Sequence, residues 1–585
     1  MDPALPIGGY QVWSGCSSVN NADTAENRVI RDMPLPLVLA LGLVALAAIV
    51  LFARNLFVDN AVVFHDEYVY KLWSDPNFLP SDIIDRHLAQ LMPNRLYFFV
   101  YSLAAGAGQN FYALAQWFNV AFWAAGIAAL IPIAVRLDIA PGRIVLLVGA
   151  AVLLPMSMYT KYFMPEAMYF ALFMLATWLV LGLRSGRARE RLAAAGFVIG
   201  SMYYVKPHAI FLFGVVLAFL LCSKVKLRLV AALLLGVAAG FLVCKLSFPP
   251  QVDLPSASMG VYAEKIHEWA QHILNYDSGA KGLAKDVMHV AAGHLALFFA
   301  MFSLPLVVLC GTLRTRLGFV QASQHDVQAL DFARYLLIAT TVLIGVAVVF
   351  TVSAGEIGRL HSRYYFFLAP LWLLAMLMAE RAKLARPGKI AVALLSTIAI
   401  AYLVIFGRRY SVTLPISVVS DGPEWAFLFV SRTVAGGTLV LLWLGMLWSL
   451  RTRADCRVWI FAIMVSSIAS ACYVTVQQKG VFRNDLSEGS EASAIEKVLG
   501  REAMEHALVV GRDRLEVSMF LFPLRSAPYM AYAPHGAHID PLIQDKANLR
   551  WVILLWKDYP APAGSQCIFV GERVRACSLS QARTL

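Results

Sequence analysis

A long succession of apolar segments separated by short polar loops constrains the fold of this chain more than any other feature. Of its 585 residues, 59% are hydrophobic and only 15% are charged, and its mean hydropathy is +0.66. That is too little charge for an ordinary soluble protein. A run of about 20 apolar residues in a helix covers the hydrocarbon core of a bilayer, which is roughly 30 Å thick. The sequence therefore predicts an all-α polytopic membrane protein.

About thirteen segments could cross the membrane, although a few are shorter than the ideal length and the stretch 144–205 could be divided differently. They lie near 34–54, 110–135, 144–160, 165–183, 192–205, 208–223, 229–248, 291–313, 335–352, 363–379, 389–406, 432–450 and 457–477. The polar tail 1–33 lacks the basic start and apolar core of a cleavable signal peptide, and we expect it to be cytoplasmic. The membrane domain is predicted to span 34–477.

Basic residues set the expected orientation. The loop that follows each even-numbered segment is basic, and these loops contain Arg136 and Arg143, Arg184 to Arg191, Lys224 to Arg228, Arg314 and Arg316, Arg381 to Lys389, and Arg451 to Arg457. Cytoplasmic loops carry such an excess of Lys and Arg, so the net charge of +12 indicates loop orientation and not nucleic-acid binding. Arg408 and Arg409 are an outnumbered exception.

This orientation places most of the chemically capable residues on the outer face. The predicted outer loops include 55–109, 161–166, 206–208, 249–290 and 356–365. Apolar stripes at helical spacing in 81–92 and 258–274 predict two short helices. Each could lie in the membrane interface, or could be an ordinary loop helix packed on the bundle.

The composition changes after residue 477, and we expect residues 478–585 to form a small α/β extracytoplasmic domain. Residues 507–510 and 551–555 resemble buried strands, and 494–506 resembles a helix. Pairing the runs 568–570 and 574–576 around Glu572 places Cys567 opposite Cys577. An oxidising exterior would permit a disulfide between them.

Two acidic positions are candidates for catalysis. Asp66 and Glu67 are adjacent, so only one of them can point into a given cavity, and a partly desolvated Asp66 would suit general-base work. The alternative is a pair of solvated loop acids. Glu166 follows Pro165 at the start of a segment, where it could face the same cavity or could simply stabilise the helix dipole, an effect of about 0.3–1 kcal/mol.

Several cations and histidines on the same side could bind an anion. Lys206 precedes Pro207 at the end of a segment, where it could bind a lipid phosphate or extend to the membrane surface. Arg359, His361 and Arg363 lie within five positions on the outer side, contrary to the usual charge distribution, and Arg matches phosphate in a bidentate manner. This favours anion binding over a structural role.

The remaining motifs, present or absent, limit the classes of function that fit the sequence. His65, His208 and His361 allow a divalent metal ion, but no spacing such as HExxH supports one. The predicted spans contain almost no charged residues at mid-membrane, which argues against a proton-coupled transporter. The sequence contains no Walker A loop and no GxSxG motif.

The order of these motifs resembles the GT-C glycosyltransferases, in particular the bacterial branch that includes lipid A aminoarabinose transferase and relatives of the protein O-mannosyltransferases. The resemblance covers roughly the first 380 residues and is at the level of pattern. It is carried by His65-Asp66-Glu67, Met92-Pro93-Asn94-Arg95, Tyr162-Phe163-Met164-Pro165-Glu166, Val205-Lys206-Pro207-His208 and Arg363-Tyr364-Tyr365-Phe366-Phe367-Leu368-Ala369-Pro370.

The resemblance implies an inverting transfer of a sugar from a polyprenyl-phosphate carrier to a glycolipid, polysaccharide or protein at the outer face of the bacterial inner membrane. Asp66 would be the base, with Glu67 and Glu166 as further acids of the site. Lys206, Arg359, Arg363, Tyr364, Arg95, His208 and His361 would be candidates to bind the carrier phosphate. Metal dependence stays open, with His65, Asp66 and Glu166 as candidate ligands. A lipid-linked sugar flippase and a polysaccharide polymerase or ligase are the competing interpretations.

Overall fold

The computed structural model describes most of the chain between residues 35 and 579. The described residues are 35–57, 65–74, 93–105, 107, 111–248, 271, 279–316, 324–379, 384–411, 422–452, 456–512, 514–521, 524, 529–534, 536–544, 548–570 and 573–579. Some side chains in these ranges, including those of His65 and Asp66, lie outside the description. So do the predicted surface helix 81–92 and, apart from residue 271, the predicted helix 258–274.

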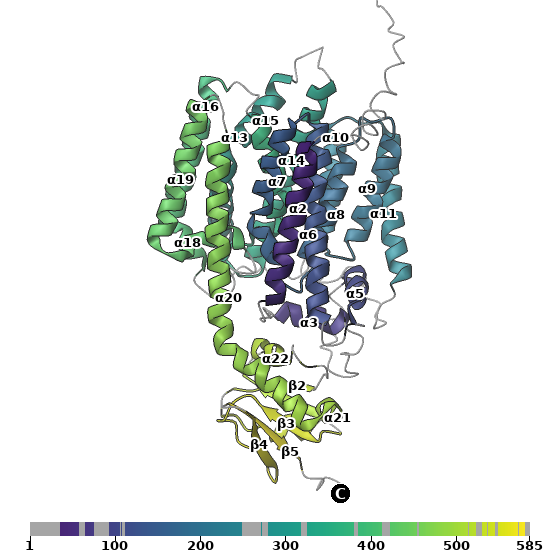
Figure 1. Ribbon diagram of the computed structural model, residues 1–585, viewed down its shortest axis with the longest axis vertical. Helices are drawn as coiled ribbons and strands as arrows, with labels where there is room; N and C mark the ends of the chain where they lie inside the picture. Colours follow the sequence, from purple (N-terminus) through teal and green to yellow (C-terminus); the bar gives the residue numbers. More distant parts are fainter. Residues whose placement is uncertain are drawn as a thin grey trace, which may run out of the picture.

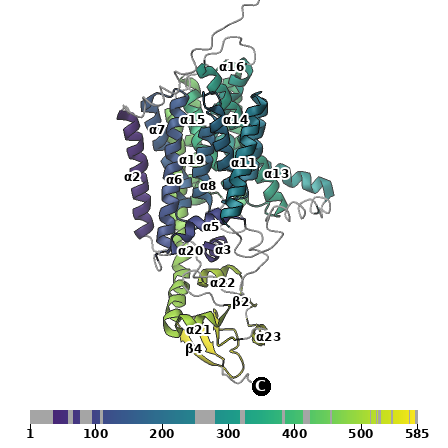
Figure 2. The same cartoon turned by 90° about the vertical axis from the view of Figure 1, so that its right-hand side faces the viewer.

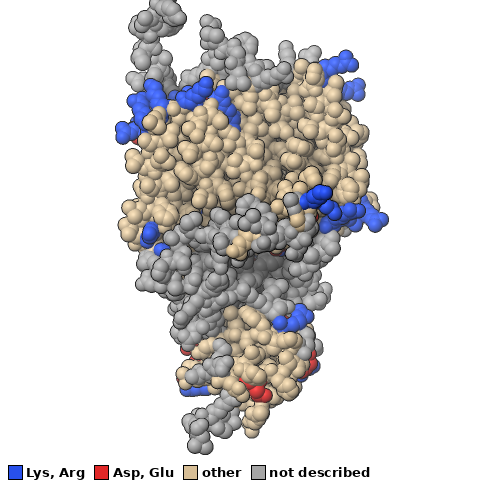
Figure 3. Space-filling view, turned by 180° about the vertical axis from the view of Figure 1, so that it is seen from behind, with Lys and Arg blue, Asp and Glu red and all other residues tan. Residues whose placement is uncertain are grey.

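A bundle of α-helices forms the larger part of the molecule (Figure 1). In the described part of the chain, eight helices contain a stretch that is long and apolar enough to cross a membrane. They are α2 (Leu35–Phe57), α6 (Phe111–Arg136), α11 (Leu227–Ser247), α13 (Gly279–Arg316), α14 (Gln324–Ser353), α16 (Arg386–Phe406), α19 (Arg432–Arg451) and the first half of α20 (Arg457–Leu499). Figure 3 shows a broad band of this bundle without Lys or Arg, bordered by basic residues at both edges. A lipid-embedded surface requires such a band.

Five of the predicted spans are short helices. They are α7 (Pro141–Val152), α8 (Glu166–Val180), α9 (Ala188–Met202), α10 (Ala209–Cys222) and α15 (Ala369–Ala379). At 1.5 Å per residue these helices are about 16–22 Å long, which is less than the roughly 30 Å core of a bilayer. The predicted count of thirteen spans is therefore not confirmed, although each of the predicted segments contains a helix.

Segments that are not α-helical interrupt the bundle beside these short helices. One contains the 3₁₀ helix η3 (Pro155–Thr160) between α7 and α8, and a second is the turn 203–208 between α9 and α10. A third contains η5 (Ser362–Tyr364) and η6 (Phe366–Leu368) before α15. Proline contributes to these breaks because it has no N–H and its ring disfavours a helical residue before it. Irregular backbone at membrane depth is stable only when it is buried in protein or lines a cavity.

Close backbone packing between α9 and α11 fixes one of these breaks. A Cβ atom at Gly200 would come within 2.2 Å of the carbonyl oxygen of Val237, and one at Gly236 within 2.1 Å of that of Ala193. Only glycine permits this approach, which is a common way for membrane helices to associate. The contact holds the end of α9, from which the turn 203–208 emerges.

Short helices gather at the end of the bundle that faces the C-terminal domain (Figure 1). They include α3 (His65–Ser74) and α5 (Arg95–Ser102). The side chain of Asn94 donates to the carbonyl of Val205 at 2.6 Å, so the start of α5 is tied to the turn 203–208. Farther along the chain lie η7 (Gly407–Ser411), η8 (Pro423–Trp425) and α18 (Phe427–Val430).

The C-terminal part of the chain forms the predicted α/β domain. α20 runs out of the bundle into this domain (Figure 1) and is followed by α21 (Arg501–Glu505), β1 (Ala507–Gly511), α22 (Arg514–Leu521), β2 (Tyr529–Tyr532), α23 (Asp540–Gln544), β3 (Trp551–Leu554), β4 (Gln566–Val570) and β5 (Val574–Ser578). The strand order is β2-β1-β3-β5-β4, with β1 parallel to β2 and β3. The predicted helix 494–506 is the end of α20 followed by α21, because Gly500 adopts a φ of 82° between them.

The predicted disulfide is present. β4 and β5 are antiparallel, and their register places Cys567 opposite Cys577, whose sulfur atoms are bonded. The register also places Val570 opposite Val574, in agreement with the predicted pairing of the two runs.

The C-terminal domain contacts α3, the helix of the bundle that contains Asp66 and Glu67. In Figure 2, α22 lies directly beneath α3. The buried ammonium group of Lys71 in α3 donates to the carbonyl oxygen of Leu524 at 3.0 Å. The domain therefore supports α3, the helix that contains Asp66 and Glu67.

Candidate functional site

A buried pocket lies where the non-helical segments of the bundle meet. The space between its lining atoms, open solvent included, is about 390 Å³, and its polar side chains come from five separate parts of the chain. It is lined by Met156, Tyr159, Glu166, Tyr169, Lys206, His208, Arg363, Tyr364, Phe366, Phe367 and Glu424. Five of these residues, Glu166, Lys206, His208, Arg363 and Tyr364, are among those that the sequence predicted. Residues as far apart in the sequence as Met156 and Glu424 thus meet in one cavity.

An ion pair forms one side of the pocket. The ammonium group of Lys206 lies 2.8 Å from Oε1 of Glu166, and both side chains are nearly buried. Glu166 is the first residue of α8, directly after Pro165, and Lys206 lies in the turn between α9 and α10. The second carboxylate oxygen of Glu166 is buried and has no hydrogen-bond partner among the described residues. That oxygen is available to a ligand.

The ring of Tyr364 is surrounded by three basic side chains. Lys206 Nζ lies 5.6 Å from the ring centre, and the guanidinium carbon of Arg363 lies 5.5 Å from it. The imidazole of His208 stacks on the same ring at 4.3 Å. A tyrosine face attracts cations through its quadrupole, with about 0.5–2 kcal/mol per contact. Tyr364 therefore holds Lys206 and Arg363 close together despite their mutual repulsion.

His208 contributes no charge to this arrangement near neutral pH. Burial lowers the pKa of His208 well below its ordinary value, and the charges of Lys206 and Arg363 lower it further. While Glu424, the other acid of the pocket, is protonated, Lys206, Arg363 and the carboxylate of Glu166 leave one excess positive charge. An enclosed site with this charge suits an anion such as phosphate.

Glu424 is a pocket residue that the sequence analysis missed. It lies on η8, is buried, and accepts a hydrogen bond from Ser362 at 2.7 Å. Burial raises its pKa to about 7, against the smaller lowering effect of the Ser362 hydrogen bond. The dipeptide Pro423-Glu424 repeats the pattern of Pro165-Glu166 and could have drawn attention to this position.

Glu67 lies within the bundle and not in a solvated loop. Its side chain is fully buried, and Oε1 accepts a hydrogen bond from the backbone N–H of Phe163 at 2.6 Å. Phe163 belongs to the segment between η3 and α8 that leads to Glu166. This contact brings α3, and with it the backbone of Asp66, next to the segment that carries the pocket residue Glu166. The side chain of Asp66 lies outside the described residues, so its predicted role as base stays a prediction.

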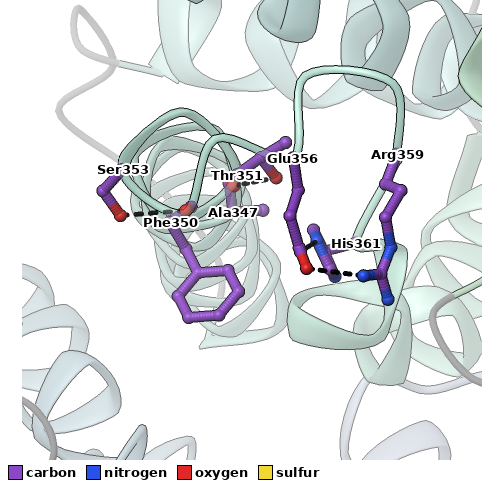
Figure 4. Close-up of polar contacts among 7 residues, drawn as sticks. All are labelled: Ala347, Phe350, Thr351, Ser353, Glu356, Arg359 and His361. Carbon is purple, nitrogen blue, oxygen red and sulfur yellow. Dashed lines mark hydrogen bonds and ion pairs between the residues drawn. The ribbon is translucent and has the colours of Figure 1, made fainter. Parts of the chain in front are cut away.

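Arg359 and His361 bind a neighbouring carboxylate. Figure 4 shows both side chains directed toward the carboxylate of Glu356. Arg359 Nη1 lies 2.5 Å from Oε1 of Glu356, and His361 Nε2 lies 2.5 Å from Oε2. Of the three basic residues predicted in 359–363, Arg363 lines the pocket, whereas Arg359 and His361 form a cluster beside it.

Arg95 also lies outside the lining of this pocket. Its guanidinium carbon is 6.0 Å from the centre of the Tyr204 ring, and Nη1 donates to the carbonyl of Phe248 at 3.5 Å. Tyr204 precedes Lys206 by two residues. Arg95 therefore contacts the turn that carries Lys206, which is a supporting position for that residue.

The described side chains of the candidate metal ligands do not form a metal site. Among these, no three His, Cys, Asp or Glu residues lie close enough to hold an ion. Two of the predicted ligands, His65 and Asp66, have side chains outside the description, and Oε1 of Glu166 is bonded to Lys206. A metal site at these residues stays a prediction.

A second, apolar pocket lies next to the polar one. It is lined by Leu297, Phe298, Phe302, Thr340, Tyr365, Phe366, Leu368, Ala369 and Trp372. Phe366 borders both pockets. The polar site is thus bordered by a surface suited to hydrocarbon.

Comparison with known proteins identifies a fold but no family. No family model matches the chain, and no curated protein matches it in sequence. Among solved structures, ArnT from Cupriavidus metallidurans bound to undecaprenyl phosphate aligns with 92% of this chain and 98% of its own, at 14% identity and a TM-score of 0.52. The apo structure of the same protein aligns with 91% of this chain and 98% of its own, at 13% identity and a TM-score of 0.42. The first of these alignments shows that the chain shares the fold of ArnT over nearly its whole length.

Proposed function

We propose that this protein is a membrane glycosyltransferase of the GT-C type. It transfers a sugar from a polyprenyl-phosphate carrier to an acceptor glycolipid, polysaccharide or protein, with inversion at the anomeric carbon. The shared fold with ArnT, whose structure contains undecaprenyl phosphate, supports the choice of a polyprenyl-phosphate ligand. The low identity makes the residues of the pocket the stronger argument.

The observation that carries the proposal is the pair of cations held by one tyrosine in a buried pocket. Lys206 and Arg363 both lie over the ring of Tyr364. When a glycosyl phosphate bond breaks, the departing phosphate gains negative charge. Cations that are already fixed in place stabilise this charge without reorganising, which lowers the barrier to transfer. A transporter that breaks no bond has no need for such preorganisation.

The proposed reaction is a single displacement. Asp66 removes the proton of the acceptor hydroxyl group while the acceptor oxygen attacks the anomeric carbon. The bond from that carbon to the phosphate oxygen breaks at the same time. The carrier phosphate leaves with the bonding electron pair toward Lys206 and Arg363. Oε2 of Glu166 has no partner among the described residues and accepts a hydroxyl of the sugar or acceptor. Glu67, which receives the Phe163 N–H, holds α3 in place.

The remaining predicted residues take supporting roles in this proposal. His208 stacks on Tyr364 as a neutral ring and so positions it. Arg95 supports the turn of Lys206 through Tyr204. Arg359 and His361, both bonded to Glu356, order the segment that precedes Arg363 (Figure 4).

The apolar pocket suits the carrier's hydrocarbon chain. It adjoins the polar pocket at Phe366 and is lined mainly by aromatic and aliphatic side chains. We propose that the first isoprenoid units after the phosphate lie there, because burial of each CH₂ group contributes about 0.8 kcal/mol.

We further propose that the site faces the outer side of the bacterial inner membrane. The basic loops predicted to be cytoplasmic support this orientation. The C-terminal domain, with its disulfide, would then be periplasmic, where disulfides persist.

A reconstituted transfer assay tests the proposal. The full chain in liposomes receives a polyprenyl-phosphate sugar and a lipid acceptor fraction, and release of free polyprenyl phosphate is measured. We expect release in the wild type and its loss in Asp66→Asn, with carrier binding retained. Movement of the intact donor across the bilayer without release would instead indicate a flippase. Full turnover by Asp66→Asn would contradict the assignment of the base.

A further inference from the structure

Glu424 is a carboxyl group in the pocket to which the proposed reaction gives no role. It is only 1% exposed and lies on η8, between α16 and α18, far in sequence from the other pocket residues. Its backbone is fixed to α20, because Ser470 donates to its carbonyl oxygen at 3.2 Å and accepts from the N–H of Phe427 at 3.0 Å. A group held this firmly has a defined position in the cavity.

The two oxygens of Glu424 have different surroundings. Oε2 accepts the hydroxyl of Ser362 at 2.7 Å. Oε1 is buried and has no hydrogen-bond partner among the described residues. No described Lys, Arg or His lies within ion-pair distance of either oxygen. The pocket therefore contains a buried polar atom that has no partner among the described residues and that a ligand in the cavity can satisfy.

The protonated form of Glu424 fits this position better than the carboxylate. A buried charge without a partner costs far more free energy than a buried neutral carboxyl group. Burial accordingly raises the pKa of Glu424 to about 7. Because Oε2 already accepts from Ser362, the proton belongs on Oε1, where it needs an acceptor.

None of the other groups that face the cavity forms a hydrogen bond with Oε1 of Glu424, so a bound ligand can supply the acceptor. They are Tyr159 of η3, Glu166 and Tyr169 of α8, Lys206 and His208 between α9 and α10, and Arg363 and Tyr364 of η5. Burial raises the pKa of the Tyr365 hydroxyl group, and Tyr365 is also close enough for the charge of Glu424 to raise it further. Ionisation of Glu424 would add a second negative charge to a pocket with two cations and would remove its excess positive charge. Protonation preserves that excess.

We infer that Glu424 is a further ligand-contacting residue, which in its protonated form donates a hydrogen bond from Oε1 to an anionic oxygen of the phosphate bound by Lys206 and Arg363. This inference rests on the proposed function. It has a thermodynamic consequence: phosphate and the Glu424 proton bind together, so each strengthens the binding of the other. The ligand is bound tightly while Glu424 is protonated and weakly once it is ionised.

A pH series of binding measurements tests this inference. Radiolabelled undecaprenyl phosphate is bound to the full-length protein in nanodiscs between pH 6 and pH 9. The wild type, Glu424→Gln and Ser362→Ala are compared, with Glu491→Gln as a control, since Glu491 is a buried carboxyl that does not line the pocket. The phosphate itself titrates in this range, but it does so equally in every variant.

The expected result is a difference between the pH profiles. Relative to Glu424→Gln, the wild-type Kd rises about tenfold between pH 6 and pH 8, because one proton is lost above a pKa of about 7. The Ser362 hydrogen bond lowers the pKa of Glu424. Ser362→Ala therefore shifts the rise to higher pH, and Glu491→Gln follows the wild type.

Two results would overturn the inference. One is the same pH profile in Glu424→Gln and the wild type, and the other is loss of binding by Glu424→Gln at every pH. A wild type that binds no undecaprenyl phosphate at any pH would contradict the proposed function itself, which is a distinguishable failure.

Discussion

The ammonium group of Lys206 lies 2.8 Å from the Oε1 atom of Glu166, although 40 positions separate the two residues in the sequence. The contact connects the start of α8 to the turn between α9 and α10, and its two side chains are 11% and 8% exposed. It neutralises one of the two cations in the pocket and leaves Arg363 to supply the excess positive charge. Both the stability of the bundle and the affinity for an anion therefore depend on it.

Removing one partner of this ion pair should destabilise the protein. Glu166→Gln and Lys206→Met each leave a buried charge without its counter-charge, which costs about 3–5 kcal/mol. The double variant should lose less than the sum of the two single losses, because both charges are then absent. Thermal unfolding in detergent measures this, with the exposed Lys226→Met as the control. Additive losses would show that the two side chains do not interact.

Arg363 and Arg359 should differ in their effect on carrier binding. Arg363 lines the pocket, whereas Arg359 is bonded to Glu356. Arg363→Ala should weaken the binding of undecaprenyl phosphate at least tenfold, since a charge-assisted contact contributes about 1.5–3 kcal/mol. Arg359→Ala should change it less than threefold. Equal losses would place Arg359 in the binding site as well.

The ring of Tyr364, and not its hydroxyl group, should matter for binding. Tyr364→Phe retains the face that Lys206, Arg363 and His208 contact, and it should bind the carrier like the wild type. Tyr364→Leu removes three ring contacts and should weaken binding about tenfold, at roughly 0.5–2 kcal/mol per cation contact. The two variants are compared in the same nanodisc binding assay. A loss in Tyr364→Phe as large as that in Tyr364→Leu would point to the hydroxyl group instead.

The stability of the protein should depend on pH through Glu424. Its folded pKa of about 7 lies above the ordinary value of 4.5, so the folded state binds its proton more tightly than the unfolded state. Below pH 4.5 the Glu424 carboxyl group is therefore neutral in both states, and its ionisation does not reduce the free energy of unfolding. Its penalty grows as pH rises from 4.5 to 7 and reaches about 3 kcal/mol above that, at 1.36 kcal/mol per pKa unit.

Glu424→Gln removes this pH-dependent penalty. The variant should gain stability relative to the wild type between pH 5 and pH 8, which thermal unfolding at the two pH values measures in the absence of ligand. A constant difference between the two proteins would show that Glu424 does not change its protonation state in this range.

The topology predicts which positions are accessible from outside. In a background in which the free cysteines are replaced by serine, Ser185→Cys should resist impermeant thiol reagents in intact spheroplasts. The exposed Ala563→Cys in the C-terminal domain should react. Labelling of residue 185 but not of residue 563 would reverse the orientation, and with it the side on which the pocket opens.

Hydropathy and charge predicted much of the fold because the bilayer restricts which residues can lie in its core and at its two surfaces. The apolar segments located the helices, and the shift in composition near residue 477 located the C-terminal domain, including the pairing of Cys567 with Cys577. The number of full spans could not be obtained in this way. A half-length helix such as α8 continues into buried irregular backbone that is as apolar as a helix, so hydropathy does not register where the helix ends.

The site was only partly accessible from the sequence. Glu166, Lys206 and Arg363 stood out because each is a charge next to a proline or an apolar run. Which cations share a cavity is decided by tertiary contacts, and the bond from Glu356 to Arg359 is visible only in the structure (Figure 4). Glu424 was missed because its loop was considered only for orientation, although it repeats the Pro-Glu pattern of Glu166.

The central claim is that Lys206 and Arg363 stabilise a departing carrier phosphate. The most direct measurement is single-turnover release of polyprenyl phosphate from a bound polyprenyl-phosphate sugar, in the wild type and in Lys206→Met and Arg363→Ala, at donor concentrations that saturate each protein. We expect the rate to fall at least a hundredfold in both variants at saturation, since the lost contacts act on charge that develops during bond cleavage. An unchanged rate at saturation, with only the donor affinity reduced, would contradict it.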